Sequence, residues 1–247
     1  MQYKEYGKQN RDVIILLHGG GLSWWNYREV AERLQNVFRI IVPILDGHAG
    51  SDKNFTTIED NAAEIISFID VKFGGSVLLI GGLSLGGQIL LEMLSQRKDI
   101  CRFAMVESAA VIPSKLTYLL IKPAFGSCYG LIRQKWFSKL QFRSLRIKSE
   151  LFNDYQDTCG ITKQNMIVFL QESSMYFMKK SLRECTTDIH LFVGERENKR
   201  IRFSARKLHE TLEKSNLHVL QTMHHGEFSI NHADLYVKEL CAIAKQR

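Results

Sequence analysis

Short apolar runs alternate with amphipathic stretches along most of the 247 residues. Runs that end at glycine, proline or a polar turn predict buried strands over residues 13–17, 38–42, 77–80, 103–106, 189–193 and 217–220. Apolar positions at helical spacing predict helices over residues 24–34, 56–73, 88–96, 201–214 and 233–245. This alternation predicts an α/β fold with a mostly parallel, doubly wound sheet and helices on both of its faces.

Residues 113–187 interrupt the alternation and hold the excess positive charge. Lys and Arg outnumber Asp and Glu there by 12 to 5, so this segment accounts for the whole formal charge of +7. Within it, residues 133–148 mix basic and apolar residues. That mixture is typical of either a surface helix with a basic, solvated face or an interfacial helix on a membrane. We favour the solvated face, because the aromatic residues of the segment can turn toward a core.

The composition sets further limits. With 45% hydrophobic and 24% charged residues, the chain is expected to form one large domain or a core with an insertion. The polar N-terminus and the absence of a long apolar run predict neither secretion nor a transmembrane segment. Five scattered cysteines without CxxC spacing predict reduced thiols and a cytoplasmic location. No motif predicts a metal site, a cofactor or nucleic-acid binding.

The strand predicted over residues 77–80 leads into Gly82-Leu83-Ser84-Leu85-Gly86 and then into a helix. A nucleophilic serine needs a strained strand-to-helix turn, and glycines two residues before and after it avoid collisions with the neighbouring strand and helix. The helix N-terminus also points backbone N–H groups toward charge that develops near the serine. Ser84 is therefore predicted to be a nucleophile, and a glycine-rich turn without chemistry is the alternative.

These features resemble the α/β-hydrolase superfamily, in particular its small esterase-like and lipase-like members. The likeness spans almost the whole chain and also rests on His18-Gly19-Gly20-Gly21 and on Asp46-Gly47-His48-Ala49-Gly50-Ser51. The resemblance implies that residues 113–187 form a helical cap inserted between strands 6 and 7 of the usual eight-stranded sheet. Residues 1–112 and 188–247 would then form the hydrolase core.

The catalytic base implied by the resemblance is His225, because His225-Gly226-Glu227 aligns with the Gly-His-Gly-Glu setting of relatives. Such a histidine takes the proton of the serine hydroxyl. His224 is the nearest alternative. His232 is expected to cap a helix, and His218 is expected to lie within a strand.

The resemblance also implies an oxyanion hole and a carboxylate that orients the base. The oxyanion donors would be the backbone N–H groups of Gly20 and Leu85. The acid would be Glu197, in the loop after the penultimate strand, where relatives often carry aspartate. Glu107, at the end of the strand over residues 103–106, and Glu195 are the alternatives.

Together these residues predict a serine hydrolase that cleaves a carboxylic ester or thioester through an acyl-enzyme intermediate. The expected partner is a small ester, apolar or anionic. Acyl transfer, peptide cleavage and hydrolysis of a carbon–carbon bond stay open, because the same residues would catalyse them. The alternative function is a catalytically weak protein of the same fold that binds a small ligand or a partner through its cap.

Overall fold

The computed structural model describes residues 1–132, 134–157 and 160–246. Residue 133, where the basic segment noted above begins, and Cys159 lie outside the described residues. The strands are β1 Tyr3–Tyr6, β2 Val13–Leu17, β3 Arg39–Pro43, β4 Val77–Leu83, β5 Cys101–Glu107, β6 Asp188–Gly194 and β7 Ser215–Leu220.

The α-helices are α1 Arg28–Leu34, α2 Ile58–Phe73, α3 Leu85–Gln96, α4 Lys115–Ile132, α5 Lys135–Ser144, α6 Phe152–Asp157, α7 Lys163–Met175, α8 Lys199–Thr211, α9 Glu227–Asn231 and α10 Ala233–Ala244. Short 3-10 helices are η1 Trp24–Tyr27, η2 Ser149–Leu151 and η4 Lys180–Glu184. None of the described helices is both long and apolar enough to cross a membrane.

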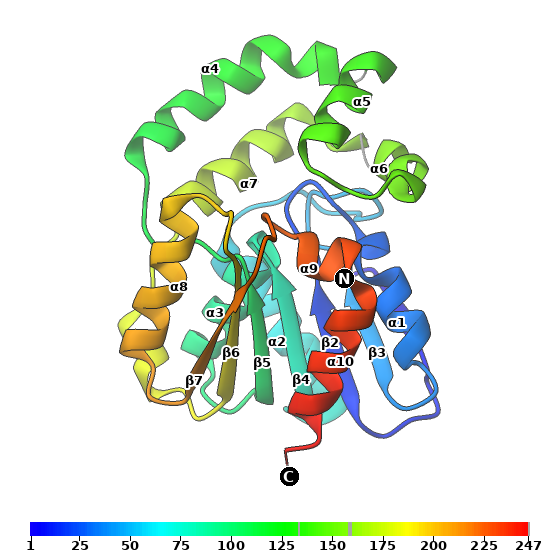
Figure 1. The fold of residues 1–247 in the computed structure, drawn as a ribbon, viewed down its shortest axis with the longest axis vertical. Helices are drawn as coiled ribbons and strands as arrows, with labels where there is room; N and C mark the ends of the chain where they lie inside the picture. The colour runs from blue at the N-terminus through cyan, green and yellow to red at the C-terminus, as the bar shows by residue number, and fades with distance from the viewer. Residues whose placement is uncertain (133, 158–159, 247) are drawn as a thin grey trace.

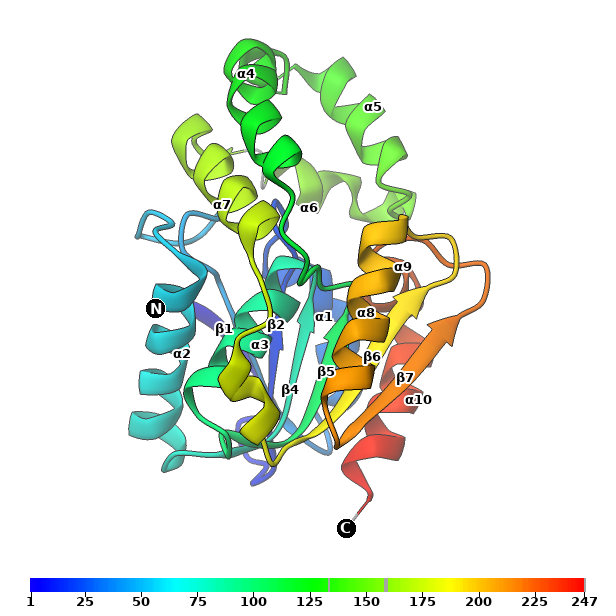
Figure 2. The same ribbon diagram turned by 90° about the vertical axis from the view of Figure 1, so that its left-hand side faces the viewer.

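The described strands form one seven-stranded sheet in the order β1-β3-β2-β4-β5-β6-β7. β1 pairs antiparallel with β3, and all the other pairs are parallel. Helices α1 and α10 cover one face of the sheet, and α2, α3 and α8 cover the other (Figures 1 and 2). The predicted α/β fold class is confirmed.

The strands between the two edges of the sheet are buried on both faces, which explains why they appear in the sequence as nearly continuous apolar runs. In β2, Ile14 and Leu16 belong to the core under α1 and α10, whereas Ile15 and Leu17 belong to the core under α2 and α3. All four side chains are fully buried. The central strands β2 and β4 therefore form a rigid platform for the loops that follow their carboxyl ends.

The first strand was not predicted from the sequence. β1 consists of the polar segment YKEY, which pairs only at the edge of the sheet and is partly exposed along its length. A strand that buries no continuous apolar face leaves no periodic signal of the kind on which the other strands were predicted.

Helices α4, α5, α6 and α7 lie above the carboxyl edge of the sheet, whereas η4 packs against α3; α4 and α5 lie at the end of the molecule farthest from the C-terminus (Figures 1 and 2). The insertion was expected between strands 6 and 7 of the usual eight-stranded sheet. The described strands number seven, so the helical segment follows β5 and precedes β6.

Candidate active site

Ser84 lies in the sharp turn between β4 and α3, with φ 52° and ψ −109°. This positive φ is unfavourable for a residue with a side chain and lifts the hydroxyl clear of the sheet. The flanking glycines make the turn possible. A Cβ atom on Gly82 would lie 2.4 Å from the Gly86 carbonyl oxygen, and one on Gly86 would lie 2.2 Å from the Leu17 carbonyl oxygen.

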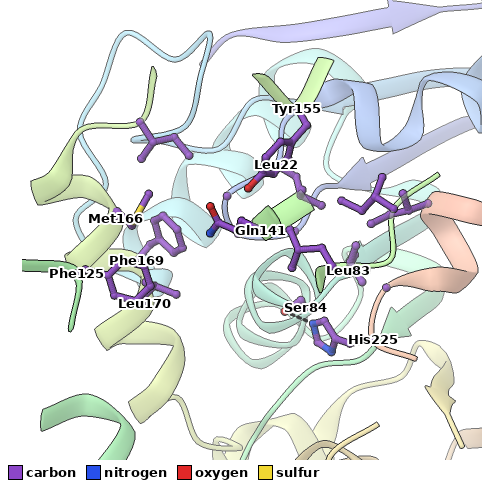
Figure 3. A pocket seen from close by; sticks show the side chains of 18 residues that line it. Leu22, Leu83, Ser84, Phe125, Gln141, Tyr155, Met166, Phe169, Leu170 and His225 are labelled. Carbon is purple, nitrogen blue, oxygen red and sulfur yellow. Dashed lines mark hydrogen bonds between the residues drawn. The ribbon is translucent and has the colours of Figure 1, made fainter. Parts of the chain in front are cut away.

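The fold brings Ser84 together with His225 and Glu197. The Nε2 atom of His225 lies 3.0 Å from the Ser84 hydroxyl oxygen, a contact drawn in Figure 3. The Nδ1 atom lies 2.9 Å from Glu197 Oε2. When Nδ1 carries the proton, its N–H donates a hydrogen bond to the Glu197 carboxylate. Nε2 is then unprotonated and can accept the proton of the serine hydroxyl. These three residues come from loops that follow β4, β6 and β7.

The Glu197 carboxylate is buried and fully hydrogen-bonded. Its side chain is 0% exposed, whereas that of His225 is 46% exposed. Its second oxygen, Oε1, accepts hydrogen bonds from the Ser108 hydroxyl and from the Gly194 N–H, each at 2.8 Å. Three donors thus hold the Glu197 side chain in one orientation, although it is longer than the aspartate expected at this position.

Ser108 was not recognised in the sequence as part of this site. It follows β5 directly and has a positive φ of 58°, so its hydroxyl is turned toward the loop after β6. Nothing in the sequence marks this serine, because its contact with Glu197 spans 89 residues. Only the juxtaposition of two strand ends creates it.

The competing carboxylates make other hydrogen bonds. Glu195 is exposed and accepts a hydrogen bond from the Thr222 N–H. Glu107 is buried at the end of β5 and accepts one from the Ser229 N–H at 3.3 Å. Neither makes a hydrogen bond to His225 among the described residues.

The competing histidines make no hydrogen bond to Ser84 among the described residues. The backbone N–H of His224 donates to Glu227, and His232 is exposed at the start of α10. His218, within β7, lies 3.2 Å from a ring nitrogen of His190 and stacks on Phe192.

The predicted oxyanion donors lie side by side. A Cβ atom on Gly20 would lie 3.5 Å from the Cβ of Leu85, and Gly20 and Ser84 line the same cavity. Leu85 is the first residue of α3, where backbone N–H groups have no partner within the helix. Both N–H groups are therefore placed where they could stabilise negative charge near Ser84.

Two buried polar side chains hold the Gly20 loop. His18 Nε2 accepts a hydrogen bond from the Leu45 N–H, so its Nδ1 carries the proton and donates to the Gly19 carbonyl at 2.9 Å. Burial lowers the pKa of His18 to about 3, which keeps the ring neutral. The Asn26 side-chain oxygen accepts from the Gly19 N–H. His18 thus positions the loop rather than titrating.

A cavity of about 250 Å³ opens above Ser84 and His225 and extends beneath helices α4, α5, α6 and α7. Figure 3 shows the Ser84–His225 pair at one end of it and an apolar cluster at the other, formed by Phe125, Met166, Phe169 and Leu170. Apart from Ser84 and His225, its polar side chains are Gln141 and Tyr155, and no Lys, Arg, Asp or Glu is among the described residues that line it.

A family model described as the alpha/beta hydrolase fold matches residues 12–140, more than half of the chain. The chain belongs to the α/β-hydrolase family. No curated protein sequence matches it significantly.

Solved structures resemble this α/β hydrolase over nearly its full length. MenH from S. aureus has a TM-score of 0.79 at 16% identity and covers 100% of this chain and 98% of its own. An enol-lactonase from Burkholderia xenovorans has 0.81 at 14%, covering 99% and 95%. An esterase from Exiguobacterium antarcticum has 0.81 at 17%, also covering 99% and 95%. At these identities the likeness concerns the fold, and a hydrolase activity agrees with the family.

Glu107 gives this α/β hydrolase a second buried carboxyl group close to its candidate acid. Burial raises the pKa of Glu107 to about 7, and the nearby Glu197 carboxylate adds to the rise. The Oε2 atom of Glu107 has no hydrogen-bond partner among the described residues. The Glu107 carboxyl group therefore fits its site better when protonated, unlike the triply hydrogen-bonded Glu197 carboxylate.

Proposed function

We propose that the protein is a serine hydrolase that cleaves a neutral, largely apolar carboxylic ester or thioester through an acyl-enzyme intermediate. The observation that carries the proposal is the hydrogen-bonded series from Ser84 through His225 to the buried Glu197, placed at one end of an apolar cavity. A serine, an imidazole and a carboxylate in this order supply a nucleophile, a base and an orienting anion.

In the first step, the Ser84 oxygen attacks the ester carbonyl carbon while His225 Nε2 takes its proton. The carbonyl oxygen becomes negatively charged, and the N–H groups of Gly20 and Leu85 stabilise it. The imidazolium then gives the proton to the leaving alcohol or thiol, and the acyl group stays on Ser84. In the second step His225 takes a proton from water while the water oxygen attacks the acyl carbon. The bond between the acyl carbon and the Ser84 oxygen then breaks, His225 returns the proton to that oxygen, and the acid leaves. Glu197 keeps its charge throughout and stabilises the imidazolium.

The lining of the cavity supports a neutral substrate. An anionic acyl group would be buried without a cationic partner, because the described lining residues include none, and unpaired buried charge is unfavourable. The volume of about 250 Å³ suits an acyl group of modest size. These features favour the apolar over the anionic ester considered from the sequence.

Gln141 supports one further property of the substrate. Its Oε1 atom is buried in the cavity wall and has no hydrogen-bond partner among the described residues. A buried acceptor without a donor costs free energy of about 1–3 kcal/mol, which a ligand can recover. We therefore propose that the substrate presents a hydroxyl or N–H group to Gln141.

Residues 113–187 act in this proposal as a cap over a core made of residues 1–112 and 188–247. Phe125 of α4 and Phe169 of α7 belong to the same cavity as Ser84. A cap that excludes water strengthens the electrostatic contacts in the site and determines which acyl groups enter.

The test is labelling with a fluorophosphonate probe, followed by hydrolysis of p-nitrophenyl esters. Native protein is expected to become labelled on Ser84 and to hydrolyse short and medium acyl esters, whereas Ser84→Ala should do neither. Ser108→Ala, which keeps all three reacting side chains, should still become labelled but more slowly. Absence of labelling of the native protein, or equal labelling of Ser84→Ala, would exclude the proposal.

A further inference from the structure

Helix α4 presents apolar side chains on two opposite faces. Its inner face contributes Ile121, which is buried, and Phe125, which lines the cavity. Its outer face carries Leu116, Leu119 and Leu120, which are 69%, 66% and 56% exposed. A helix that is apolar all round is normally buried on all sides. The outer face of α4 is therefore more apolar than a helix face in contact with water normally is.

Helix α5 also exposes apolar side chains. Trp136 and Leu140, one helical turn apart, are 63% and 59% exposed, while Phe142 on the opposite face is buried. The expectation that the aromatic residues of this segment turn toward a core thus fits Phe142 but not Trp136. We call the five most exposed apolar side chains of α4 and α5 the outer cap face: Leu116, Leu119, Leu120, Trp136 and Leu140.

Positive charge surrounds the outer cap face. Residues 113–149 contain eight Lys and Arg and no Asp or Glu. Lys115 and Lys122 of α4 and Lys139 and Arg143 of α5 are all exposed, and none forms a salt bridge with a described residue. The remainder of the chain carries a formal net charge of −1, from 25 Lys and Arg against 26 Asp and Glu. Unpaired cations are thus concentrated where the exposed leucines lie.

This charge selects among the possible partners of the apolar face. A second copy of the chain would bring a surface of the same sign against it, and like charges oppose such contact. An anionic lipid surface supplies both requirements, because its acyl boundary takes up the apolar side chains and its headgroups attract the lysines. Both α4 and α5 lie at the free end of the molecule, where a planar surface can reach them (Figures 1 and 2).

We infer that the outer cap face binds the surface of a membrane that contains anionic phospholipid. Leu116, Leu120 and Trp136 enter the boundary between headgroups and acyl chains, and the flanking Lys and Arg side chains contact lipid phosphates. The inner faces of the same helices line the cavity above Ser84, so docking would place the cavity next to the lipid phase. The binding itself does not depend on catalysis.

The experiment is vesicle co-sedimentation with Ser84→Ala protein, which keeps the test separate from that of the proposed function. Vesicles of phosphatidylcholine with phosphatidylglycerol are compared with phosphatidylcholine alone. Binding to the anionic vesicles is expected to be at least tenfold stronger and to weaken in high salt. Replacing Lys122 and Lys139 by alanine should weaken it about fivefold per charge.

The apolar contribution is tested with Leu116→Ser/Leu120→Ser and with a matched control, Val37→Ser/Val71→Ser. Val37 and Val71 are 63% and 87% exposed but lie outside the cap. The leucine pair should lose most vesicle binding and the valine pair none. The fluorescence of Trp136, assigned by comparison with Trp136→Phe, should shift to shorter wavelength on anionic vesicles.

Three outcomes would overturn the inference. One is the absence of binding to anionic vesicles, and another is equal binding to both vesicle types that the lysine substitutions leave unchanged. The third is a dimer in sedimentation velocity that Leu116→Ser/Leu120→Ser dissociates, which would assign the face to a second copy of the chain.

Discussion

The substitution Glu197→Gln removes one negative charge behind His225 while keeping the size of the side chain. In the native site, Glu197 Oε1 accepts from the Ser108 hydroxyl and the Gly194 N–H, and Oε2 faces His225 Nδ1. A glutamine has only one acceptor oxygen, which would stay with the two donors. Its NH₂ group would then face Nδ1 of His225.

This rearrangement determines the size of the effect. Facing a donor, the Nδ1 atom must act as an acceptor, so the neutral ring carries its proton on Nε2, 3.0 Å from the Ser84 oxygen. The ring can no longer take the serine proton. The same tautomer change in a serine protease lowers kcat about 10⁴-fold, which corresponds to about 5 kcal/mol of activation free energy. We expect a loss of about 10³–10⁴-fold here.

The assay is steady-state hydrolysis of a p-nitrophenyl ester, with urea unfolding as a check that the variant folds. Glu195→Gln, in the same loop but exposed, is the matched control and should stay within about twofold of the native kcat/KM. Glu107→Gln should lose far less than Glu197→Gln. The reasoning is wrong if Glu107→Gln loses more, or if Glu197→Gln keeps over a tenth of the activity.

Three further predictions concern stability and specificity. Because the pKa of Glu107 is raised to about 7 in the folded state, the native protein should lose about 3 kcal/mol of unfolding free energy as pH rises from about 4.5 to above 7. Glu107→Gln should abolish this part of the pH dependence, and urea unfolding at pH 5 and pH 8 measures it; an unchanged dependence would contradict the assignment. Gly86→Ala places a Cβ 2.2 Å from the Leu17 carbonyl oxygen and should prevent folding or lower the Tm strongly, whereas Gly130→Ala, with open space around it, should not. Gln141→Leu should lower kcat/KM about tenfold for acyl esters that carry a hydroxyl group and leave unsubstituted esters unchanged; equal effects on both would argue against a contact with Gln141.

The strand over residues 77–80 and the turn at Ser84 were predictable because their signals are local. The apolar run over residues 77–80, the glycines on either side of Ser84 and the helix after them lie within twenty residues. Glycine is required there by contacts of 2.2–2.4 Å between a built Cβ and backbone oxygens. Because these requirements involve residues that are close in the sequence, the residue types alone indicate them.

The acid could only be ranked among three glutamates from the sequence. Glu197 and His225 are 28 residues apart, and Ser108 is 89 residues from Glu197, so no short-range pattern records that they meet. Their contacts follow from the parallel order of β5, β6 and β7, which brings three strand ends to one edge. The same geometry leaves Glu195 in solvent and Glu107 against Ser229.

The sequence by itself determined the alternation of strands and helices, the strained turn at Ser84 and the basic, apolar character of residues 113–149. Each depends on neighbours along the chain. Tertiary structure alone decided which carboxylate faces His225, which side chains close the cavity, and that Leu116 and Trp136 point outward rather than into a core. These properties depend on which distant segments meet, and the packing of the whole sheet and its covering helices determines that.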